Sequence, residues 1–177
     1  MSSIPHFFRK EMTTLTNEEL LFARTKPNAI IPSKRDDDAG YDIYACFDGR
    51  IYIEPNETVM IPTGLKCAFS PDYAMVLKER GSTGTKGMGQ RCGVIDASYR
   101  GEIFVPITNH SNKTIILLGP GESETMHSDI IYYPYTKAIC QAVMQYVPKL
   151  TVREVALEEI DALTTERGTG ALGSSGK

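Results

Sequence analysis

Short runs of apolar and β-branched residues follow one another along most of this chain. Turn-forming residues stand between them, as in Pro62-Thr63-Gly64 and Gly119-Pro120-Gly121. Runs of this length suit strands better than helices. Many short strands at such spacing predict an all-β fold of the sandwich or jelly-roll type. The expected strands are Leu20–Arg24, Tyr41–Cys46, Arg50–Ile53, Thr58–Ile61, Leu65–Phe69, Tyr73–Glu79, Glu102–Thr108, Lys113–Leu118 and Ile139–Val147.

A helix candidate follows the last of these runs, over Val152–Leu163. Thr151 and Glu154 have the spacing of a capping box, which favours a helix start at this point. Val152 and Val155 are β-branched and suit a strand equally well. The local pattern therefore leaves both structures open for this segment.

Length and charge restrict the classes of function. A chain of 177 residues is expected to form one domain with a sizeable core. It has 19 basic and 22 acidic residues, a net charge of −3, and no long basic run, so nucleic acid is not expected as a partner. No apolar run approaches the roughly 18 residues of a membrane span, so no membrane partner is expected.

The cysteines point to a reducing compartment. None of the four belongs to a C-x-x-C pair or to a zinc-binding pattern. Cys46, Cys67 and Cys140 lie in apolar strand-like runs, where buried free thiols are expected. These features predict a cytoplasmic protein.

The run from Gly93 to Glu102 carries the clearest chemistry. It places Asp96 and Tyr99 three residues apart on a predicted tight turn between two apolar stretches. A carboxylate on a rigid turn could deprotonate a water that attacks a phosphoanhydride. The plainer interpretation is an aspartate that caps its own turn. Tyr99 could belong to the core or press against a sugar ring.

Two polar sites lie at strands. The acidic stretch Asp36–Asp42 opens an expected strand. It is either a solvated turn or a place where Asp42 braces polar groups or positions a metal-bound water. Gln141 stands inside an apolar run, where a buried amide needs partners. Either a structural hydrogen bond or a ligand contact would satisfy it.

Two glycine-rich stretches remain. Glu79–Gly87 could be a flexible turn, or Arg80, the Ser82 hydroxyl and backbone N–H groups could surround phosphate oxygens. It lacks the spacing of a P-loop. The last residues, from Arg167 to Lys177, are too poor in apolar residues to fold alone. Such a tail is either disordered or an arm that closes over a phosphorylated ligand.

In their order along the chain, these clusters resemble the five motifs of trimeric dUTP diphosphatases (dUTPases). Each motif alone is weak to moderate evidence, but five in the same order across residues 39–177 are specific. Residues 1–20 fall outside the resemblance. The matching segments are Ala39–Asp42, Arg80–Gly84, Gly93–Glu102, Gln141 and Arg167–Gly176.

The resemblance implies a jelly-roll-like, distorted β-barrel with a flexible Gly-rich C-terminal arm. We expect an N-terminal extension over residues 1–20, a barrel over 21–163 and the arm over 164–177. The implied activity is hydrolysis of dUTP to dUMP and pyrophosphate by water attack at the α-phosphorus, which limits uracil in DNA and supplies dUMP for dTMP synthesis. The implied assembly is a homotrimer whose three active sites are shared between subunits.

The resemblance also implies roles for individual residues. Asp96 would activate the water, and Tyr99 would lie under the deoxyribose, where a ribose 2′-OH would clash. Backbone groups of Gly93–Ile95 would bind the uracil edge. Asp42 would support the site, and Mg²⁺ would be held mainly by substrate phosphates, with no direct protein ligand. The implied substrate-binding residues are Arg80, Gly81, Ser82, Gly93, Val94, Ile95, Tyr99, Gln141, Arg167, Leu172 and Ser174.

The chain departs from the family pattern in three places. Gly81 stands where the family usually has serine, so either Ser82 substitutes or backbone N–H groups bind the phosphates. Leu172 replaces an aromatic residue that stacks on uracil, a change expected to cost about 1 kcal/mol of affinity. Thr136-Lys137 replaces the usual Gly-acid pair before the Gln141 strand.

Two alternatives share the predicted fold. dCTP deaminases resemble dUTPases at the Ile95-Asp96 turn and use a glutamate on the strand that follows it. The matching position here is Pro106, which cannot transfer a proton. The other alternative is a non-catalytic dUTP-binding module that regulates a protein partner. A substrate assay would separate the three.

Overall fold

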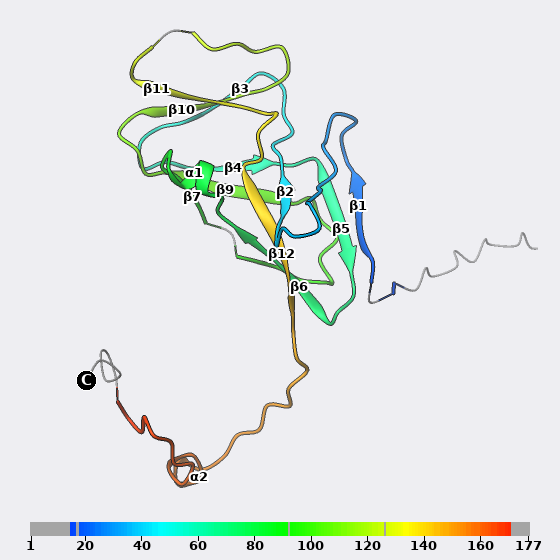
Figure 1. Ribbon diagram of the computed structural model, residues 1–177, viewed down its shortest axis with the longest axis vertical. Helices are drawn as coiled ribbons and strands as arrows, with labels where there is room; N and C mark the ends of the chain where they lie inside the picture. Colours follow the sequence, from blue (N-terminus) through cyan, green and yellow to red (C-terminus); the bar gives the residue numbers. More distant parts are fainter. Residues whose placement is uncertain (1–14, 17, 92, 126, 171–177) are drawn as a thin grey trace, which may run out of the picture. The chain divides into compact units, whose positions relative to one another are not determined.

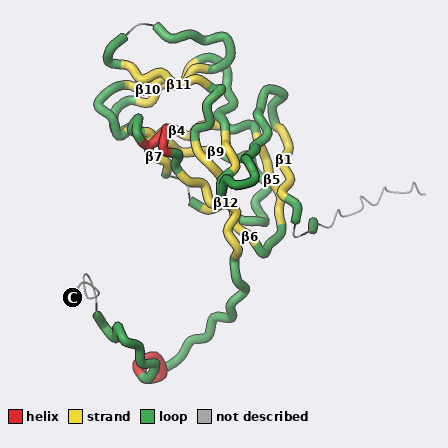
Figure 2. The backbone as a smooth tube through the Cα atoms, in the orientation of Figure 1, coloured by secondary structure: helices red, strands yellow, loops and turns green. Residues whose placement is uncertain are grey.

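The computed structural model describes residues 15, 16, 18–91, 93–125 and 127–170 (Figure 1). Their regular secondary structure consists mainly of strands joined by loops, with two short helices (Figure 2). The helices are α1 (Gly81–Gly84) and α2 (Leu157–Asp161). The strands are β1 (Leu20–Arg24), β2 (Tyr41–Ile43), β3 (Arg50–Ile53), β4 (Thr58–Pro62), β5 (Leu65–Phe69), β6 (Tyr73–Lys78), β7 (Met88–Gln90), β8 (Val94–Ile95), β9 (Phe104–Asn109), β10 (Thr114–Leu118), β11 (Ile130–Pro134) and β12 (Cys140–Tyr146).

The strands form four hydrogen-bonded sheets. Their orders are β1-β5, β11-β10-β3, β2-β12-β6-β8 and β4-β9-β7. All pairs are antiparallel except β10 with β11, which run parallel. Within the described residues, hydrogen bonding does not close the strands into a single barrel. The predicted all-β, jelly-roll-like fold is confirmed, with its barrel open between the sheets.

A single core lies between these sheets and explains why the short runs form strands. In β5 the side chains of Leu65, Cys67 and Phe69 are buried, whereas Lys66 between them is exposed. This alternation follows from the two-residue period of a strand. β10 instead buries four consecutive apolar residues, Ile115–Leu118, because both of its faces are covered.

The three cysteines that the structure describes, Cys46, Cys67 and Cys140, are buried thiols, as predicted. No helix among the described residues has the length and apolar character needed to cross a membrane.

Contacts divide the chain into two compact units, Met1–Val147 and Pro148–Lys177. The first contains every described strand, and the second contains α2. The division comes earlier than the expected start of the arm at residue 164. The three-part organisation proposed from the sequence, with its N-terminal extension, stays a prediction.

The helix expected over Val152–Leu163 is shorter than predicted. It spans only Leu157–Asp161, and its N-cap is Ala156, which makes no side-chain capping bond. The side chains of Leu157 and Ile160 are exposed, so no packed face supports a longer helix here. The capping box predicted at Thr151 is therefore not formed.

Candidate functional site

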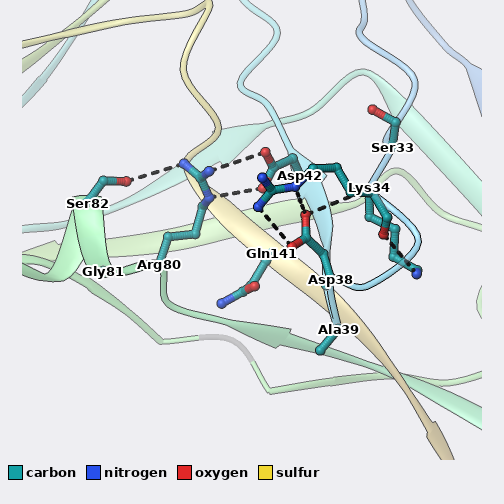
Figure 3. A pocket seen from close by; sticks show the side chains of 11 residues that line it. Ser33, Lys34, Asp38, Ala39, Asp42, Arg80, Gly81, Ser82 and Gln141 are labelled. Carbon is teal, nitrogen blue, oxygen red and sulfur yellow. Dashed lines mark hydrogen bonds and ion pairs between the residues drawn. The ribbon is translucent and has the colours of Figure 1, made fainter.

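A cavity of about 710 Å³ opens beside β2, β12 and α1 (Figure 3). Its walls carry three cationic and two acidic side chains, so it is strongly polar. The predicted residues Asp42, Arg80, Gly81, Ser82 and Gln141 all line it. The remaining lining residues are Ser33, Lys34, Arg35, Asp38, Ala39 and Gly40.

Sheet register brings these distant residues together. Gln141 of β12 lies opposite Asp42 of β2 on one side and opposite Lys78 of β6 on the other. Adjacent strands lie about 4.8 Å apart. Arg80 follows the end of β6 and precedes α1, so it reaches the same end of the sheet. Three sequence motifs thus meet at one place.

The Arg80 guanidinium is fixed by an ion pair with Asp42 and by three hydrogen bonds. Its Nε lies 3.0 Å from Asp42 Oδ1, and Nη2 donates to Asp42 Oδ2 at 3.2 Å. Nη1 donates to Ser82 Oγ and to the Ala138 carbonyl, both at 3.3 Å. Such a two-pronged pair with a carboxylate fixes the guanidinium plane and partly balances its charge. Asp42 therefore braces Arg80 at the cavity wall, and its supporting role in the site stays a prediction.

The Ala138 carbonyl has a second donor, the hydroxyl of Tyr133, at 2.7 Å. The Tyr133 side chain is buried, and burial raises the pKa of its phenol. Arg80 thus shares the Ala138 carbonyl with the buried Tyr133 and also pairs with Asp42 at the cavity wall.

The first residues of α1, Gly81 and Ser82, line this cavity. By helix geometry the N–H groups of Gly81 and Ser82, at its first two positions, have no acceptor within the helix. Thr83 stabilises the turn, because its hydroxyl bonds both the N–H and the carbonyl of Arg80. A Cβ on Gly81 would meet nothing within 4 Å, so space alone does not require glycine here.

Gln141 makes a structural hydrogen bond. Its Nε2 donates to the Glu79 carbonyl at 2.8 Å. Of the two interpretations left open by the sequence, a structural hydrogen bond therefore applies to this atom. Gly40 packs directly on the amide: a Cβ there would lie 2.5 Å from Gln141 Oε1. Glycine at position 40 is needed for this close approach.

A second cavity, of about 270 Å³, is lined by Asp96 and Tyr99. The two residues lie on a tight turn that is closed by the Tyr99 N–H donating to the Asp96 carbonyl at 3.0 Å. The turn follows β8, so Val94 and Ile95 form a short strand rather than part of the turn. The Asp96 side chain is exposed. The other lining residues are Met60, Val94, Ile95, Glu102, Ile103, Phe104 and Pro106.

The predicted site residues fall into separate groups. The Arg80 cavity lies at β2 and β12, whereas Val94 and Ile95 lie in β8, at the opposite edge of the same four-stranded sheet. The two cavities share no lining residue. Gly93 lines a third hollow, beside Leu77 and Gln90. One chain therefore does not bring all the predicted residues into one pocket.

The residues predicted for the arm are only partly described. Arg167 belongs to the second unit, where its Nε donates to the Gly170 carbonyl at 2.9 Å. Leu172 and Ser174 lie outside the described residues.

Sequence reasoning missed Ser33, Lys34, Arg35 and Asp38 of the larger cavity. Arg35 donates to both oxygens of Asp38, at 2.8 and 3.0 Å. This guanidinium holds the pKa of the Asp38 carboxyl below its usual range. The signal in the sequence that could have identified these four residues was their position just before the Ala39–Asp42 motif.

A model of the dUTPase family matches residues 26–118. The chain belongs to the dUTPase family. Deoxyuridine 5'-triphosphate nucleotidohydrolase of Candida albicans is 29% identical over 184 residues, which cover 100% of this chain and 99% of that protein. The Janthinobacterium sp. protein of the same name is 36% identical over 143 residues, covering 78% and 83%.

Solved dUTPase structures share the fold. A mutant dUTPase of Staphylococcus bacteriophage 80alpha with dUpNHpp superposes with a TM-score of 0.72 at 24% identity, covering 89% of this chain and 98% of that one. A dUTPase of S. aureus phage phi11, described with a structural Mg(II) ion, gives a TM-score of 0.62 at 21% identity, covering 77% and 96%. At this identity the likeness concerns the fold.

Proposed function

We propose that this dUTPase-family protein hydrolyses dUTP to dUMP and pyrophosphate, by attack of water on the α-phosphorus. The observation that carries the proposal is the polar cavity in which Asp42, Arg80, Ser82 and Gln141 meet. The Candida albicans and Janthinobacterium relatives bear the name of this activity. Family membership and the cavity support the same reaction.

The larger cavity suits the triphosphate. Arg80 is preorganised by Asp42, and the backbone N–H groups of Gly81 and Ser82 add donors without charge. A fixed cation and fixed dipoles stabilise charge that develops on phosphate oxygens. Ser82 already contacts Arg80, so we propose that it takes the part of the serine usual at position 81. Gln141 would complete the wall.

The smaller cavity suits the nucleoside and the reacting water. Asp96 is exposed on a hydrogen-bonded turn, where it can accept a proton from water. Tyr99 would lie against the deoxyribose. We propose that backbone groups of Gly93, Val94 and Ile95 bind the uracil edge, in a space too narrow for the methyl group of thymine.

The donor set fits magnesium that is bound largely through the substrate. Mg²⁺ prefers oxygen ligands and is commonly held by one or two carboxylates together with phosphates. Within the described residues, no three His, Cys, Asp or Glu side chains gather closely enough to hold a metal ion. Asp42 is the carboxylate of the predicted set that lines the larger cavity. Held mainly by the substrate phosphates and by no protein group directly, Mg²⁺ would neutralise phosphate charge in this cavity.

We propose a homotrimer in which neighbouring chains complete each site. The separation of the Arg80 and Asp96 cavities within one chain supports this assembly, because dUTP would need groups from both. The arm of residues 164–177 would then close the site, with Arg167 on the γ-phosphate, Leu172 over the base and Ser174 beside the substrate. The buried thiols suit a reducing cytoplasm.

Deamination of dCTP is disfavoured by the same geometry. Pro106, at the position where deaminases carry their glutamate, lines the cavity of Asp96 and Tyr99. A proline there offers no group that could transfer a proton to the base.

A substrate panel tests the proposal. The purified protein is incubated with dUTP, dCTP, dTTP or UTP and Mg²⁺, and the products are separated by ion-exchange chromatography. We expect dUMP and pyrophosphate from dUTP alone. Conversion of dCTP to a uracil nucleotide would identify a deaminase. Thermal stabilisation by dUTP without turnover would identify the non-catalytic binding module.

A further inference from the structure

Tyr99 is held against its own loop by residues that have no role in the scheme above. Its hydroxyl donates to the main-chain carbonyl of Glu102 at 3.0 Å. The ring packs over Gly101, where a Cβ would overlap the Tyr99 hydroxyl and ring carbons. The ring orientation therefore depends on the absence of a side chain at position 101 and on the location of the Glu102 carbonyl.

The Glu102 side chain fixes the location of the Glu102 carbonyl through bonds to two other segments. Its Oε1 accepts the Gly64 N–H at 3.0 Å, and its Oε2 accepts the Thr25 hydroxyl at 3.1 Å. The Thr25 N–H donates in turn to the Gly64 carbonyl at 2.7 Å. These three bonds form a closed ring that joins the Tyr99 loop to the β4–β5 turn and to the residue after β1.

The anchor point is itself rigid. Gly64 has a φ of +66°, and a Cβ there would lie 2.8 Å from Cys46 Sγ and 2.9 Å from Ala29 Cβ. Beside it, the Thr63 hydroxyl donates to the Ile103 carbonyl at 2.7 Å, and the Ile103 N–H donates to the Leu65 carbonyl at 2.8 Å. The side-chain bonds of Glu102 thus attach Tyr99 to a part of the core with little freedom to move.

We propose that Glu102 is a positioning residue that sets sugar selectivity by fixing Tyr99 through the Thr25–Gly64 anchor. This inference rests on the proposed function, in which Tyr99 lies against the deoxyribose. A ring held in one place excludes a 2′-hydroxyl sterically, whereas a ring free to shift makes room for it. Both carboxylate oxygens of Glu102 are engaged with protein groups, so it acts through Tyr99 rather than on the ligand.

Two substitutions of Glu102 separate the effect of its side-chain hydrogen bonds from the effect of its negative charge. Glu102→Ala removes both side-chain bonds. Glu102→Gln keeps them, because the amide oxygen can accept the Gly64 N–H and the amide nitrogen can donate to the Thr25 hydroxyl. For each variant, kcat and KM are measured with dUTP and with UTP. We expect Glu102→Ala to lower the ratio of kcat/KM for dUTP to that for UTP about tenfold or more, and Glu102→Gln to keep it within about twofold.

The outcomes are decisive in each direction. An unchanged ratio in folded Glu102→Ala, or an equal loss of activity on both substrates, would overturn the inference, because a merely structural role weakens both alike. If Glu102→Ala does not fold, Thr25→Val decides: it removes one exposed anchor bond, and the same ratio must fall. Wild-type protein that turns over no dUTP would instead refute the proposed function.

Discussion

Arg80 and Asp96 are held in place by different means. Arg80 relies on side-chain and carbonyl partners, and its bonds to Asp42 fix its direction and offset part of its charge. Asp96 is placed by the main chain of its turn, and its carboxylate is exposed to solvent. A cation fixed in this way suits binding, and an exposed carboxylate on a fixed turn suits proton transfer.

Asp96→Asn is therefore expected to abolish most activity while leaving the fold intact. Asparagine has the same shape and cannot take a proton from water, so we predict that kcat for dUTP falls by a factor of about 10² or more. The turn is closed by the Tyr99 N–H and the Asp96 carbonyl, which the substitution keeps. Steady-state kinetics and thermal melting measure the two effects.

Asp48→Asn provides a matched control, because Asp48 is also exposed and lies on the Asp48-Gly49 turn, away from both cavities. We expect its kcat to equal that of the wild type. Near-normal turnover by Asp96→Asn would refute the role proposed for Asp96.

At the scale of elements, the contact between β12 and the start of β2 shapes the larger cavity. Gly40→Ala would push a methyl group into Gln141 Oε1 and displace the amide from the cavity wall. We predict a rise in KM for dUTP of about tenfold, together with a loss of about 1–3 kcal/mol in the free energy of unfolding from overpacking. Kinetics and urea unfolding check both values.

Gly84→Ala is the corresponding control for stability. A Cβ at position 84 would make only an ordinary contact, 3.9 Å from Glu79 Oε2, so we expect its free energy of unfolding to match or exceed the wild-type value. Unchanged KM and stability in Gly40→Ala would show that the close packing on Gln141 has no functional role.

Short apolar runs bounded by turn residues were enough to predict most strands, because such runs are too short for helices. β1, β3 and β5 have the predicted bounds. β7 was missed because glycines surround it. Gly89 leaves room there for the His110 ring, which a Cβ at position 89 would displace. β11 was missed although Ile130–Tyr133 has strong strand propensity, because the local pattern does not reveal its parallel partner β10.

The candidate site was predictable as a set of residues but not as an arrangement. The motifs identified Asp42, Arg80 and Gln141, which the register of β2, β12 and β6 brings together. Asp38 belonged to a stretch that could be a solvated acidic turn, and Arg35 lay outside every motif, because no local signal shows that these residues border a cavity. The distance of Asp96 from that cavity depends on strand order in the sheet, which spacing along the chain does not encode.

At the scale of the whole molecule, buried thiol and phenol groups with a raised pKa predict how the free energy of unfolding depends on pH. Burial raises the pKa of the Cys46 and Cys67 thiols and of the Tyr133 phenol above their unfolded values. Between the unfolded and folded pKa the native state binds more protons, so the free energy of unfolding falls as pH rises. We expect the free energy of unfolding to begin falling at about pH 8.5 for the thiols and at about pH 10 for the phenol.

Urea unfolding at about pH 7, pH 9 and pH 10 measures the fall. A Cys46→Ala, Cys67→Ala double variant should lose less stability than the wild type between about pH 7 and pH 9, whatever its absolute stability. Equal losses in the two proteins would show that the buried thiols do not contribute.

Co-assembly of two inactive variants tests most directly whether the Arg80 and Asp96 clusters of different chains form one dUTP-hydrolysing site. Arg80→Ala and Asp96→Asn are purified separately, mixed in equal amounts under denaturing conditions and refolded together, and dUMP release is measured. Random assembly pairs an intact Arg80 cluster with an intact Asp96 cluster from a neighbour in about one quarter of sites. We therefore predict recovery of about a quarter of wild-type activity. If the refolded mixture is no more active than the separately refolded variants, the Arg80 and Asp96 clusters of different chains do not form a shared site.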